Sequence, residues 1–422
     1  MRTLVLGAGV SGRAALRLAT RLGHRVSVYD RRPVTDIGDA AVASGVWDPL
    51  SLQGIDLVVA SPGFGERSAP ITDAIESGIE IISEVEFAWR EMSAPTVAVT
   101  GTNGKTTVTG LIADMLTASG LRAPGLGNIG TPVSDWAFEP LDVIVLEMSS
   151  FQLRFVDRFH PTVAVITNVA EDHLDWHGSV AGYRAAKARI VANQTAGDIV
   201  VYDAQDPGAV ELASRSSATP VGVAVDGTTR VGVVDEMLVW DGLAVPLTTL
   251  TVDDPIYFTD MALAGAAALA MGAEPSAVES VCQTFLPGEH RRRVVFAADG
   301  VRWVDDSKAT NPHAALASIA SFDSVVLIAG GLAKGLDVAP LATAPGVKAV
   351  IAIGESAPVL LDAAGTRGRP AGSMQEAVAI AREITAPGDV VLLAPGCASY
   401  DMFDSYGARG DAFAAAARSE DQ

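Results

Sequence analysis

The chain has 422 residues, which at about 150 residues per domain corresponds to two to four domains. Hydrophobic residues make up 49% of the chain and charged residues 19%, a composition that excludes a disordered protein. Thirty Lys and Arg against 50 Asp and Glu give a net charge of −20, which argues against a broad nucleic-acid or anionic-membrane surface. Two cysteines imply no disulfide framework, and no apolar run reaches the ~18 residues of a membrane span. We therefore expect a globular cytoplasmic protein without nucleic-acid partners or membrane insertion.

Short apolar runs rich in Val, Ile and Leu recur along the chain and predict strands buried on both faces. They lie at residues 3–7, 25–30, 56–63, 96–101, 143–149, 163–168, 324–331, 347–354 and 389–396. Stretches with helical spacing lie between many of them, for example at 13–22, 107–119 and 373–385. This alternation predicts α/β domains with mostly parallel sheets, in which ligands bind beyond the carboxyl ends of the strands.

Two interruptions divide the pattern. A helical stretch at 84–92 ends before residues 93–95, and a later helical run ends before residues 286–288. Boundaries at these points predict three domains, residues 1–93, 94–287 and 288–422.

Two segments differ from the parallel pattern. Residues 230–252 have the composition of antiparallel strands, with Asp241-Gly242 as a turn. Asp299-Gly300 predicts a second hairpin.

The first motif is GAGVSG at residues 7–12, which follows a strand and opens a helix. Glycines at this spacing let backbone amides approach a pyrophosphate at a helix N-terminus, which taken alone suggests NAD. The alternative is a glycine-rich turn in a Rossmann-like domain whose cofactor site is lost or altered. Asp30 ends the next strand, and Arg31 and Arg32 after it would suit a phosphate or another nucleotide.

The second motif, VAVTGTNGKTT at residues 97–107, is the most specific one. A buried strand runs into a glycine-containing loop, and Lys105 and Thr106 open a helix. Amides of such a loop wrap phosphates, the ammonium reaches the β- and γ-oxygens, and the hydroxyl binds Mg²⁺. Val99 stands where the first glycine of the usual spacing would be. The motif predicts binding of a nucleoside triphosphate, which we expect to be ATP.

Acidic residues follow two further strands. Glu147 lies near the end of the 143–149 run and could hold the magnesium, although an exposed acid at a strand end is the alternative. His173 and His177 follow the 163–168 run, are four residues apart, and could share a helix face. A zinc pair is therefore an alternative, but no cysteine cluster or HExxH motif accompanies them.

Lysine is rare in this chain, with five lysines against 25 arginines. Four of the five, at positions 105, 187, 308 and 334, lie in motif-like segments, and the fifth is Lys348. This usage indicates positions that need a compact charge or a reactive amine, although Lys187 alone could be a solvent-facing helix lysine. No GxSxG elbow is present and Cys397 has no evident partner, so we expect electrostatic rather than covalent catalysis.

The motifs GAGVSG, GTNGKTT, EMSSFQL, NVAEDHLDWHGS, YRAAKARI, PGEHR, DSKATN, GGLAKG and APGCASYDMF follow one another in this order. Over nearly the whole chain this order resembles the Mur ligase family, and DSKATN at 306–311 resembles the branch that adds D-glutamate to UDP-N-acetylmuramoyl-L-alanine. The resemblance implies an α/β fold of three domains. These are a Rossmann-like N-terminal domain for UDP, a central P-loop ATPase with a small antiparallel section, and a Rossmann-like C-terminal domain for the amino acid. It also implies ATP-driven amide bond formation through an acyl phosphate.

The resemblance assigns site residues to each ligand. For ATP they are Gly101, Thr102, Asn103, Gly104, Lys105, Thr106, Thr107, Arg291 and Asp306. For the UDP substrate they are Ser11, Asp30, Arg31, Arg32, Gly63, Asn128, Ser149 and Gln152. For D-glutamate they are Lys308, Thr310, Lys334, Ser399 and Tyr406. Magnesium ligands would be Thr106, Glu147, His173 and a carbamylated Lys187, and catalysis would use Lys105, Glu147, His173, Lys187 and Lys308.

The chain departs from the family pattern in places. An adenine-binding Asn is expected in the helix after the antiparallel section, where Ala264 stands. Gly396 replaces an expected Ala, and Tyr406 an expected Phe. Because UDP, ATP and amino-acid motifs lie in different domains, we expect domain closure about joints near Pro95 and Pro287.

Three alternatives remain open from the sequence. They are a related ligase acting on a folate or a later peptidoglycan precursor, an NAD-dependent dehydrogenase, and a non-catalytic nucleotide-binding protein.

Overall fold

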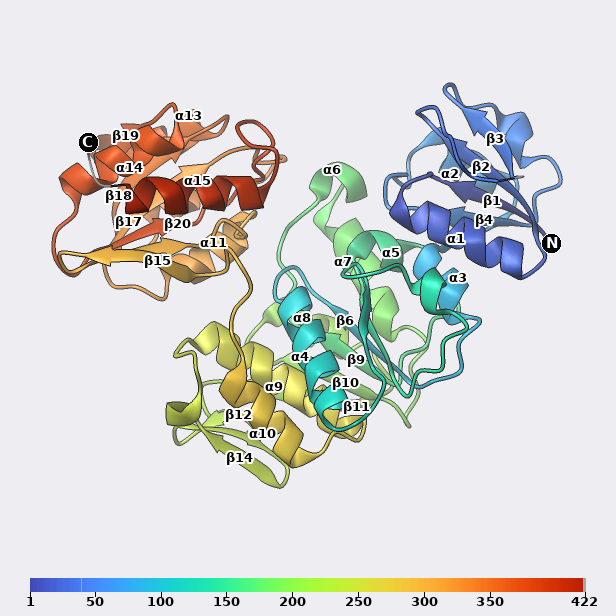
Figure 1. Cartoon of the computed structure of the whole chain (residues 1–422), viewed down its shortest axis with the longest axis horizontal. Helices are drawn as coiled ribbons and strands as arrows, with labels where there is room; N and C mark the ends of the chain where they lie inside the picture. The colour runs from blue at the N-terminus through green and yellow to red at the C-terminus, as the bar shows by residue number, and fades with distance from the viewer. Residues whose placement is uncertain (39, 420–422) are drawn as a thin grey trace. The chain divides into compact units, whose positions relative to one another are not determined.

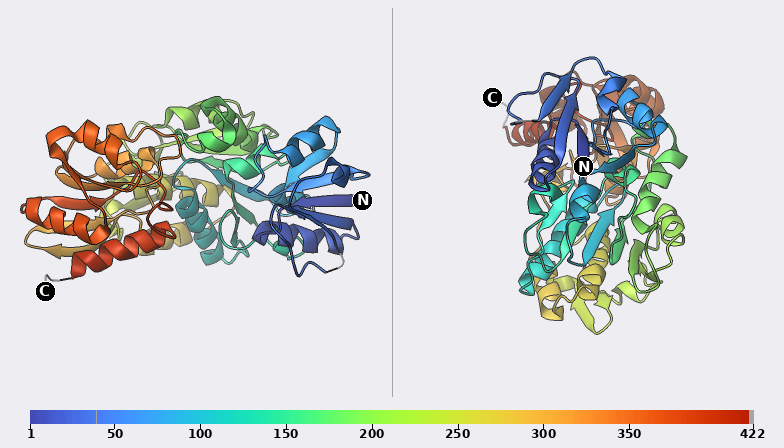
Figure 2. Two further views of the ribbon diagram at one scale, coloured as in Figure 1. Left: turned by 90° about the horizontal axis from the view of Figure 1, so that it is seen from above. Right: turned by 90° about the vertical axis from the view of Figure 1, so that its right-hand side faces the viewer.

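A computed structural model describes residues 1–38 and 40–419, and within them the chain forms three β-sheets flanked by helices (Figure 1). The contacts divide the chain into two compact units. One comprises Met1–Val169 and Trp176–Phe285 and contains the first two sheets; the other comprises Ala170–Asp175 and Leu286–Gln422 and contains the third. Figure 2 shows the helices covering both faces of the sheets. The mixed, mostly parallel α/β class expected from the sequence is confirmed.

The first sheet has five parallel strands in the order β3-β2-β1-β4-β5. The strands are β1 (Arg2–Leu6), β2 (Arg25–Asp30), β3 (Ala41–Ser44), β4 (Leu57–Ala60) and β5 (Glu80–Ser83). The helices are α1 (Val10–Arg21), α2 (Ala69–Glu76) and α3 (Glu84–Trp89), with a 3₁₀ turn at Pro49–Leu52. Between β1 and α1, Gly7 has φ +99°, and a Cβ on Gly12 would lie 1.9 Å from the Gly7 carbonyl oxygen. The glycine motif is therefore required by this tight strand-to-helix turn.

The second sheet has nine strands in the order β14-β13-β12-β11-β10-β9-β6-β8-β7. The strands are β6 (Thr96–Thr100), β7 (Gly125–Gly127), β8 (Ile144–Glu147), β9 (Val163–Ile166), β10 (Ile199–Asp203), β11 (Thr219–Ala224), β12 (Val231–Val234), β13 (Met237–Trp240) and β14 (Leu243–Pro246). The helices are α4 (Lys105–Ala118), α5 (Ser150–Arg154), α6 (Leu174–His177), α7 (Val180–Ala188), α8 (Pro207–Ala213), α9 (Pro255–Ala270) and α10 (Pro275–Thr284). Short 3₁₀ turns lie at Val133–Trp136, Arg189–Val191 and Leu247–Thr249. Antiparallel pairing joins β12 to β13 and β13 to β14, and Trp240 pairs with Leu243 around the predicted Asp241-Gly242 turn.

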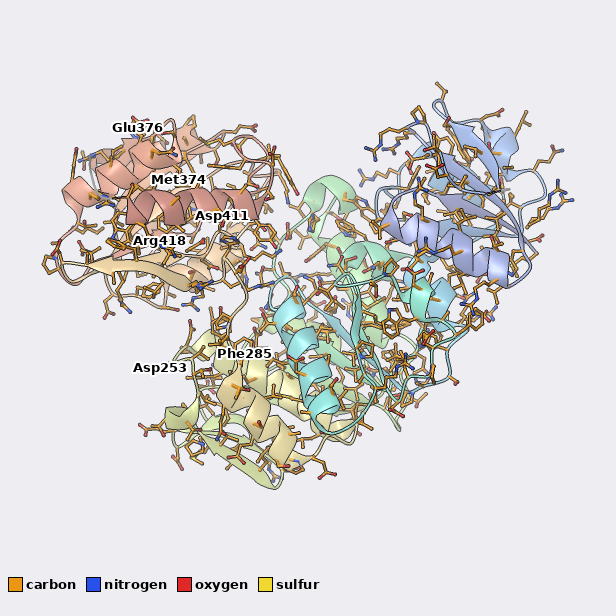
Figure 3. The ribbon with its side chains drawn as sticks, in the orientation of Figure 1. Asp253, Phe285, Met374, Glu376, Asp411 and Arg418 are labelled. Carbon is orange, nitrogen blue, oxygen red and sulfur yellow. The ribbon has the colours of Figure 1, made fainter. Side chains whose placement is uncertain are left out.

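The third sheet has six strands in the order β15-β16-β20-β17-β18-β19. The strands are β15 (Arg293–Ala298), β16 (Val301–Asp305), β17 (Val325–Gly330), β18 (Val347–Ile353), β19 (Gly368–Pro370) and β20 (Val390–Leu393). The helices are α11 (Pro312–Ile319), α12 (Ala339–Thr343), α13 (Ala357–Ala364), α14 (Met374–Ile384) and α15 (Tyr406–Arg418), with a 3₁₀ turn at Gly365–Arg367. The predicted hairpin at Asp299-Gly300 is confirmed, since Ala298 pairs with Val301. At the end of α15, Arg418 (Figure 3) donates from Nε to the Val295 carbonyl on β15 at 3.1 Å.

The sequence located the most deeply buried strands and missed short edge strands and two partly buried interior ones. All nine predicted apolar runs contain a strand, namely β1, β2, β4, β6, β8, β9, β17, β18 and β20. The pattern did not reveal β3, β5, β7 and β19, which are three- or four-residue strands at sheet edges. It also missed β10 and β11, which lie inside the second sheet but are only partly buried. Pro95 lies between α3 and β6 inside the first compact unit, so a joint there gains no support from the contacts. In the described ranges, no helix combines the length and apolar character needed to cross a membrane.

Two helical glycines give a stability test. A Cβ on Gly265 of α9 would lie 2.6 Å from the Trp240 ring, whereas a Cβ on Gly110 of α4 would meet nothing within 4 Å. We expect Gly265→Ala to lower the free energy of unfolding by about 1–3 kcal/mol through overpacking. The matched control Gly110→Ala should raise it by roughly 0.5–1 kcal/mol, because alanine restricts the unfolded chain. Thermal and urea denaturation measure both; a Gly265→Ala variant as stable as the parent contradicts the packing.

Candidate active site

The GTNGKT segment forms a tight loop between β6 and α4. A Cβ on Gly101 would lie 1.8 Å from Thr167 Oγ1, so no larger residue fits there. Gly104 is the N-cap of α4 and has φ +80°, and a Cβ there would lie 2.8 Å from Asp260 Oδ1. Both glycines are thus fixed by conformation and space, and they let backbone N–H groups gather at the α4 N-terminus, where anions are favoured.

The end of β9 holds this loop in shape. Thr102 N donates to the Asn168 carbonyl at 2.8 Å, and Asn103 N donates to Asn168 Oδ1 at 2.9 Å. In return, Thr167 Oγ1 donates to the Asn103 carbonyl at 2.5 Å. Because β6 lies between β8 and β9 and all three run parallel, their carboxyl ends share one edge of the sheet. The loop therefore lies where parallel sheets bind ligands.

Lys105 begins α4 and folds back over the loop. Its Nζ donates to the carbonyls of Gly101 at 2.9 Å and Thr102 at 3.0 Å. Thr106 and Thr107 follow in the first helical turn. An ammonium next to a phosphate-binding loop can neutralise the charge of the β- and γ-phosphates.

Glu147 ends β8 with an exposed fraction of 1%, so the alternative of an exposed acid is wrong. Its Oε1 accepts a hydrogen bond from Asn128 Nδ2 at 2.6 Å, and among the described residues Oε2 has no hydrogen-bond partner. A buried carboxylate oxygen without a donor is unfavourable unless a cation takes its place. Oxygen ligands from this carboxylate and from Thr106 fit the preference of Mg²⁺.

Lys187, on α7, has an exposed fraction of 1%, so the alternative of a solvent-facing lysine is wrong. Its Nζ donates to the Gly101 carbonyl at 2.5 Å and lies 4.8 Å from the centroid of the Tyr183 ring. The Tyr183 hydroxyl is hydrogen-bonded to Thr102 Oγ1 at 3.0 Å. Sequence reasoning found no signal for Tyr183, because a buried aromatic residue on a helix is typical of a core.

The two histidines considered as a zinc pair do not share a helix face. The helix α6 begins at Leu174, and His173 precedes it with φ +52°. His177 is hydrogen-bonded through Nε2 to Ser150 Oγ at 2.9 Å, and its ring stacks on Phe151. Within residues 1–38 and 40–419, no group of three or more His, Cys, Asp or Glu could hold a metal ion. His173 itself lies in the 170–175 segment of the second unit, and its Nε2 is 3.7 Å from Asp172 Oδ2.

The GAGVSG turn of the first sheet is tied to Asp30. Its Oδ2 accepts from Ala8 N at 2.8 Å, and its Oδ1 accepts from Arg32 N at 3.0 Å. Burial alone would raise the pKa of Asp30, but these two N–H donors and the charges of Arg32 and Arg31 lower it. Asp30 therefore stays ionised and fixes the turn, and the Arg31 guanidinium lies over the Phe64 ring.

Two other predicted substrate residues cap a helix. Ser149 is the N-cap of α5, and its Oγ accepts from Gln152 N at 3.3 Å while Gln152 Oε1 accepts from Ser149 N at 2.9 Å. A Cβ on Gly63, which follows β4, would meet nothing within 4 Å, and Ser11 lies half-buried in the first turn of α1.

The second unit brings the residues predicted for D-glutamate onto neighbouring loops. Lys308 Nζ lies 4.0 Å from the centroid of the Tyr406 ring, and Thr310 N donates to the Lys308 carbonyl at 2.8 Å. Lys334 follows β17, and buried Ser399 follows β20; a bridge between Leu332 and Ala398 joins their two loops.

Arg409 of α15 fastens the loops that follow β16 and β20. It is buried, and it donates from Nε to Ser307 Oγ at 2.9 Å, from Nη2 to the Ser307 carbonyl at 2.8 Å, and from Nη1 to the Cys397 carbonyl at 3.0 Å. Burial lowers the pKa of Arg409 to about 10, so the cation persists at neutral pH. The sequence did not single out this arginine, because it lies on a helix of ordinary composition.

Outside the phosphate loop, the residues predicted to contact the nucleotide lie on α9 and in the second unit. Ala264 has an exposed fraction of 0% in the core against α4, so the expectation that this position faces adenine is wrong. One helical turn earlier, Asp260 is the α9 residue beside the phosphate loop. Asp306, expected to address the nucleotide, is in the second unit, where burial raises its pKa to about 6 despite the nearby charge of Arg292. Arg291 precedes β15 in the same unit.

Comparison with known proteins supports the same family in all three parts of the chain. Residues 1–83 match "Mur ligase MurD-like, N-terminal domain", residues 99–230 match "Mur ligase middle domain", and residues 290–397 match "Mur ligase, glutamate ligase domain". A Frankia casuarinae protein named UDP-N-acetylmuramoylalanine--D-glutamate ligase is 42% identical, over 79% of this chain and 74% of its own length. The chain belongs to the Mur ligase family. It is an ATP-dependent ligase, so the dehydrogenase alternative is wrong.

Other relatives agree. A Thermobifida fusca protein of the same name is 40% identical, over 81% of this chain and 79% of its own length. The solved structure of a pseudomurein peptide ligase type C from Methanothermus fervidus has a TM-score of 0.59 at 18% identity, covering 94% of this chain and 97% of its own. That likeness shows that the three-domain fold is shared.

Removing the Lys105 ammonium tests the phosphate loop. We expect Lys105→Ala to lower turnover at least ~100-fold, because phosphoryl transfer depends on positioned positive charge. Lys348→Ala is the matched control, since Lys348 is a half-exposed lysine paired with Asp389 in the other unit. ADP release under saturating substrates measures both variants, and full activity of Lys105→Ala would contradict the assignment.

Proposed function

We propose that this Mur ligase joins D-glutamate to UDP-N-acetylmuramoyl-L-alanine in the cytoplasm, with ATP converted to ADP and phosphate. The observation that carries this choice of substrate is the DSKATN loop, in which Lys308 lies against Tyr406. The names of the Frankia and Thermobifida relatives support it.

In the first step, an oxygen of the alanyl carboxylate attacks the γ-phosphorus of ATP. The bond from this phosphorus to the β–γ bridging oxygen breaks, which yields an acyl phosphate and ADP. The N–H groups at the α4 N-terminus and Lys105 hold the phosphates and spread their charge. We assign residues 101–107 to this nucleotide site. The family resemblance also implies nucleotide contacts for Arg291 and Asp306, which belong to the second unit.

Thr106 and Glu147 are proposed to hold one Mg²⁺, and His173 with a carbamylated Lys187 a second. Magnesium supplies further charge neutralisation on the phosphates. The buried Glu147 Oε2, without a donor among the described residues, supports the first set, and the burial of Lys187 next to the phosphate loop supports the second.

In the second step, the amine of D-glutamate attacks the acyl carbon, and phosphate leaves from the tetrahedral intermediate. Charge-assisted hydrogen bonds suit the recognition of its carboxylates. We assign these contacts to Lys308, Thr310, Lys334 and Ser399, with Tyr406 beside them.

The UDP substrate is assigned to the first sheet and its neighbours. The GAGVSG turn places an α1 N-terminus where a diphosphate is favoured. The proposed contacts are Ser11, Asp30, Arg31, Arg32 and Gly63, and, toward the muramoyl part, Asn128, Ser149 and Gln152.

A substrate-dependence assay tests the function. We expect ADP release to require both UDP-N-acetylmuramoyl-L-alanine and D-glutamate, with L-glutamate, diaminopimelate and folates as inactive controls. ADP release that is equally fast with another amino acid would favour a related ligase. Nucleotide binding without turnover under any combination would favour a non-catalytic protein.

Substitutions of Lys187 test its assignment as a carbamylated magnesium ligand. Lys187→Arg keeps the positive charge but cannot carry a carbamate, so it should be folded and nearly inactive. Acetate should partly restore turnover of Lys187→Ala by supplying an anionic oxygen in the vacated space. Arg184→Lys, on the exposed side of the same helix, is the control and should behave like the parent. A fully active Lys187→Arg enzyme would refute the carbamate.

A further inference from the structure

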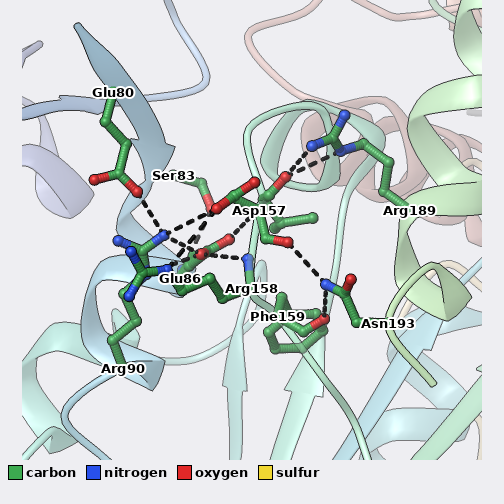
Figure 4. Close-up of polar contacts among 10 residues, drawn as sticks. Glu80, Ser83, Glu86, Arg90, Asp157, Arg158, Phe159, Arg189 and Asn193 are labelled. Atoms are coloured by element: carbon green, nitrogen blue, oxygen red, sulfur yellow. Dashed lines mark hydrogen bonds and ion pairs between the residues drawn. The ribbon is translucent and has the colours of Figure 1, made fainter. Parts of the chain in front are cut away.

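A buried carboxylate joins the first sheet to the second within one compact unit. α3 follows β5 directly, and its N-cap Ser83 accepts a hydrogen bond from Glu86 N at 3.3 Å. The Glu86 side chain has an exposed fraction of 0%. In Figure 4 it points toward Asp157 and Arg158, which belong to residues 156–159, the segment between α5 and β9.

The Glu86 carboxylate accepts two consecutive backbone N–H groups of that segment. Oε1 accepts from Arg158 N at 2.9 Å, and Oε2 accepts from Asp157 N. Arg90 donates from Nε to Oε1 at 2.9 Å and also binds Glu80 at 2.8 Å. A buried acid is stable only with such a set of donors, and its loss would leave both backbone N–H groups without their acceptor.

The same segment is held from its other side. Arg189 Nε donates to the Val156 carbonyl at 3.0 Å, and Asn193 Nδ2 donates to the carbonyls of Asp157 at 2.8 Å and Phe159 at 3.0 Å. Arg189 lies two residues after Lys187, at the end of α7. Residues 156–159 thus connect α3 of the first sheet with the helix that carries Lys187 (Figure 4).

We propose that Glu86 is a positioning residue of the ligase, which fixes the domain of the first sheet against the phosphate loop through residues 156–159. This inference rests on the proposed function. There, the uridine end of the substrate binds the first domain, while the alanyl carboxylate at its other end must reach the γ-phosphate of ATP. A small displacement of one domain would then lower the reaction rate without weakening ATP binding, because attack depends on alignment.

Glu86→Gln tests this with Glu80→Gln as the matched control, because the Glu80 carboxylate binds the Arg90 guanidinium rather than the backbone of residues 156–159. The glutamine keeps the shape, but its NH₂ group cannot accept a hydrogen bond, so one of the two backbone N–H groups loses its acceptor and the charge that binds Arg90 is removed. We expect kcat to fall ~10-fold or more in Glu86→Gln, with the Kd for ATP changed less than ~2-fold. Amide hydrogen exchange across residues 155–159 should accelerate in Glu86→Gln only. Equal kcat and equal exchange in the two variants would overturn the proposal.

A second variant, Asn193→Ala, and hydrogen exchange without substrate test the role of Glu86 independently of the folding of Glu86→Gln and of the proposed substrate. If Glu86→Gln does not fold, Asn193→Ala loosens the same segment from the α7 side and should show the same loss of kcat with ATP affinity kept; parent-like turnover of that variant would count against the proposal. Hydrogen exchange needs no substrate, so it reports on the Glu86 contacts even if the parent enzyme does not use D-glutamate. A parent enzyme without D-glutamate activity therefore refutes the proposed function, whereas an active parent with an unaffected Glu86→Gln refutes this inference alone.

Discussion

The proposed chemistry depends on the parallel register of β8, β6 and β9. Val99 lies opposite Glu147, and Thr100 lies opposite Ile166. The carboxyl ends of β8, β6 and β9 therefore lie side by side at one edge of the sheet. This register brings together an acid, a phosphate loop and the loop-shaping Asn168 from three separate stretches of sequence. The strands are buried on both faces, and a slip by one residue would move each of these groups to the wrong face.

Much of the fold could be predicted because its signals are local. Two-sided burial marks the central strands, and the glycines of the two turns are demanded by backbone conformation and space, which a motif records directly. The candidate site was harder, because Glu86, Tyr183 and Arg409 owe their importance to partners ~70 to 100 residues away along the chain. In the sequence they are ordinary helix residues. The resemblance pointed to Ala264 as the adenine position, but a motif does not record how α9 packs on α4, and this packing buries Ala264 in the core.

Glu86 and Arg409 show how this chain uses buried charge. Each is a fully buried ion that binds backbone groups outside its own helix: Glu86 accepts from two N–H groups, and Arg409 donates to two carbonyls. Charge-assisted hydrogen bonds to backbone hold a loop more specifically than apolar packing does, because they fail when the geometry changes. The acid serves the first unit and the base the second, so both compact units rely on the same device.

Arg409 also bears on how the protein is made. The loops that carry Lys308 and Ser399 are synthesised before α15, and until this helix emerges the carbonyls of Ser307 and Cys397 lack the cation that binds them in the folded protein. Since domains fold as the chain leaves the ribosome, the amino-acid loops of the nascent second unit stay unfinished until α15 docks. Damage to α15, by proteolytic clipping or premature termination, would therefore disable a site whose own residues are all intact.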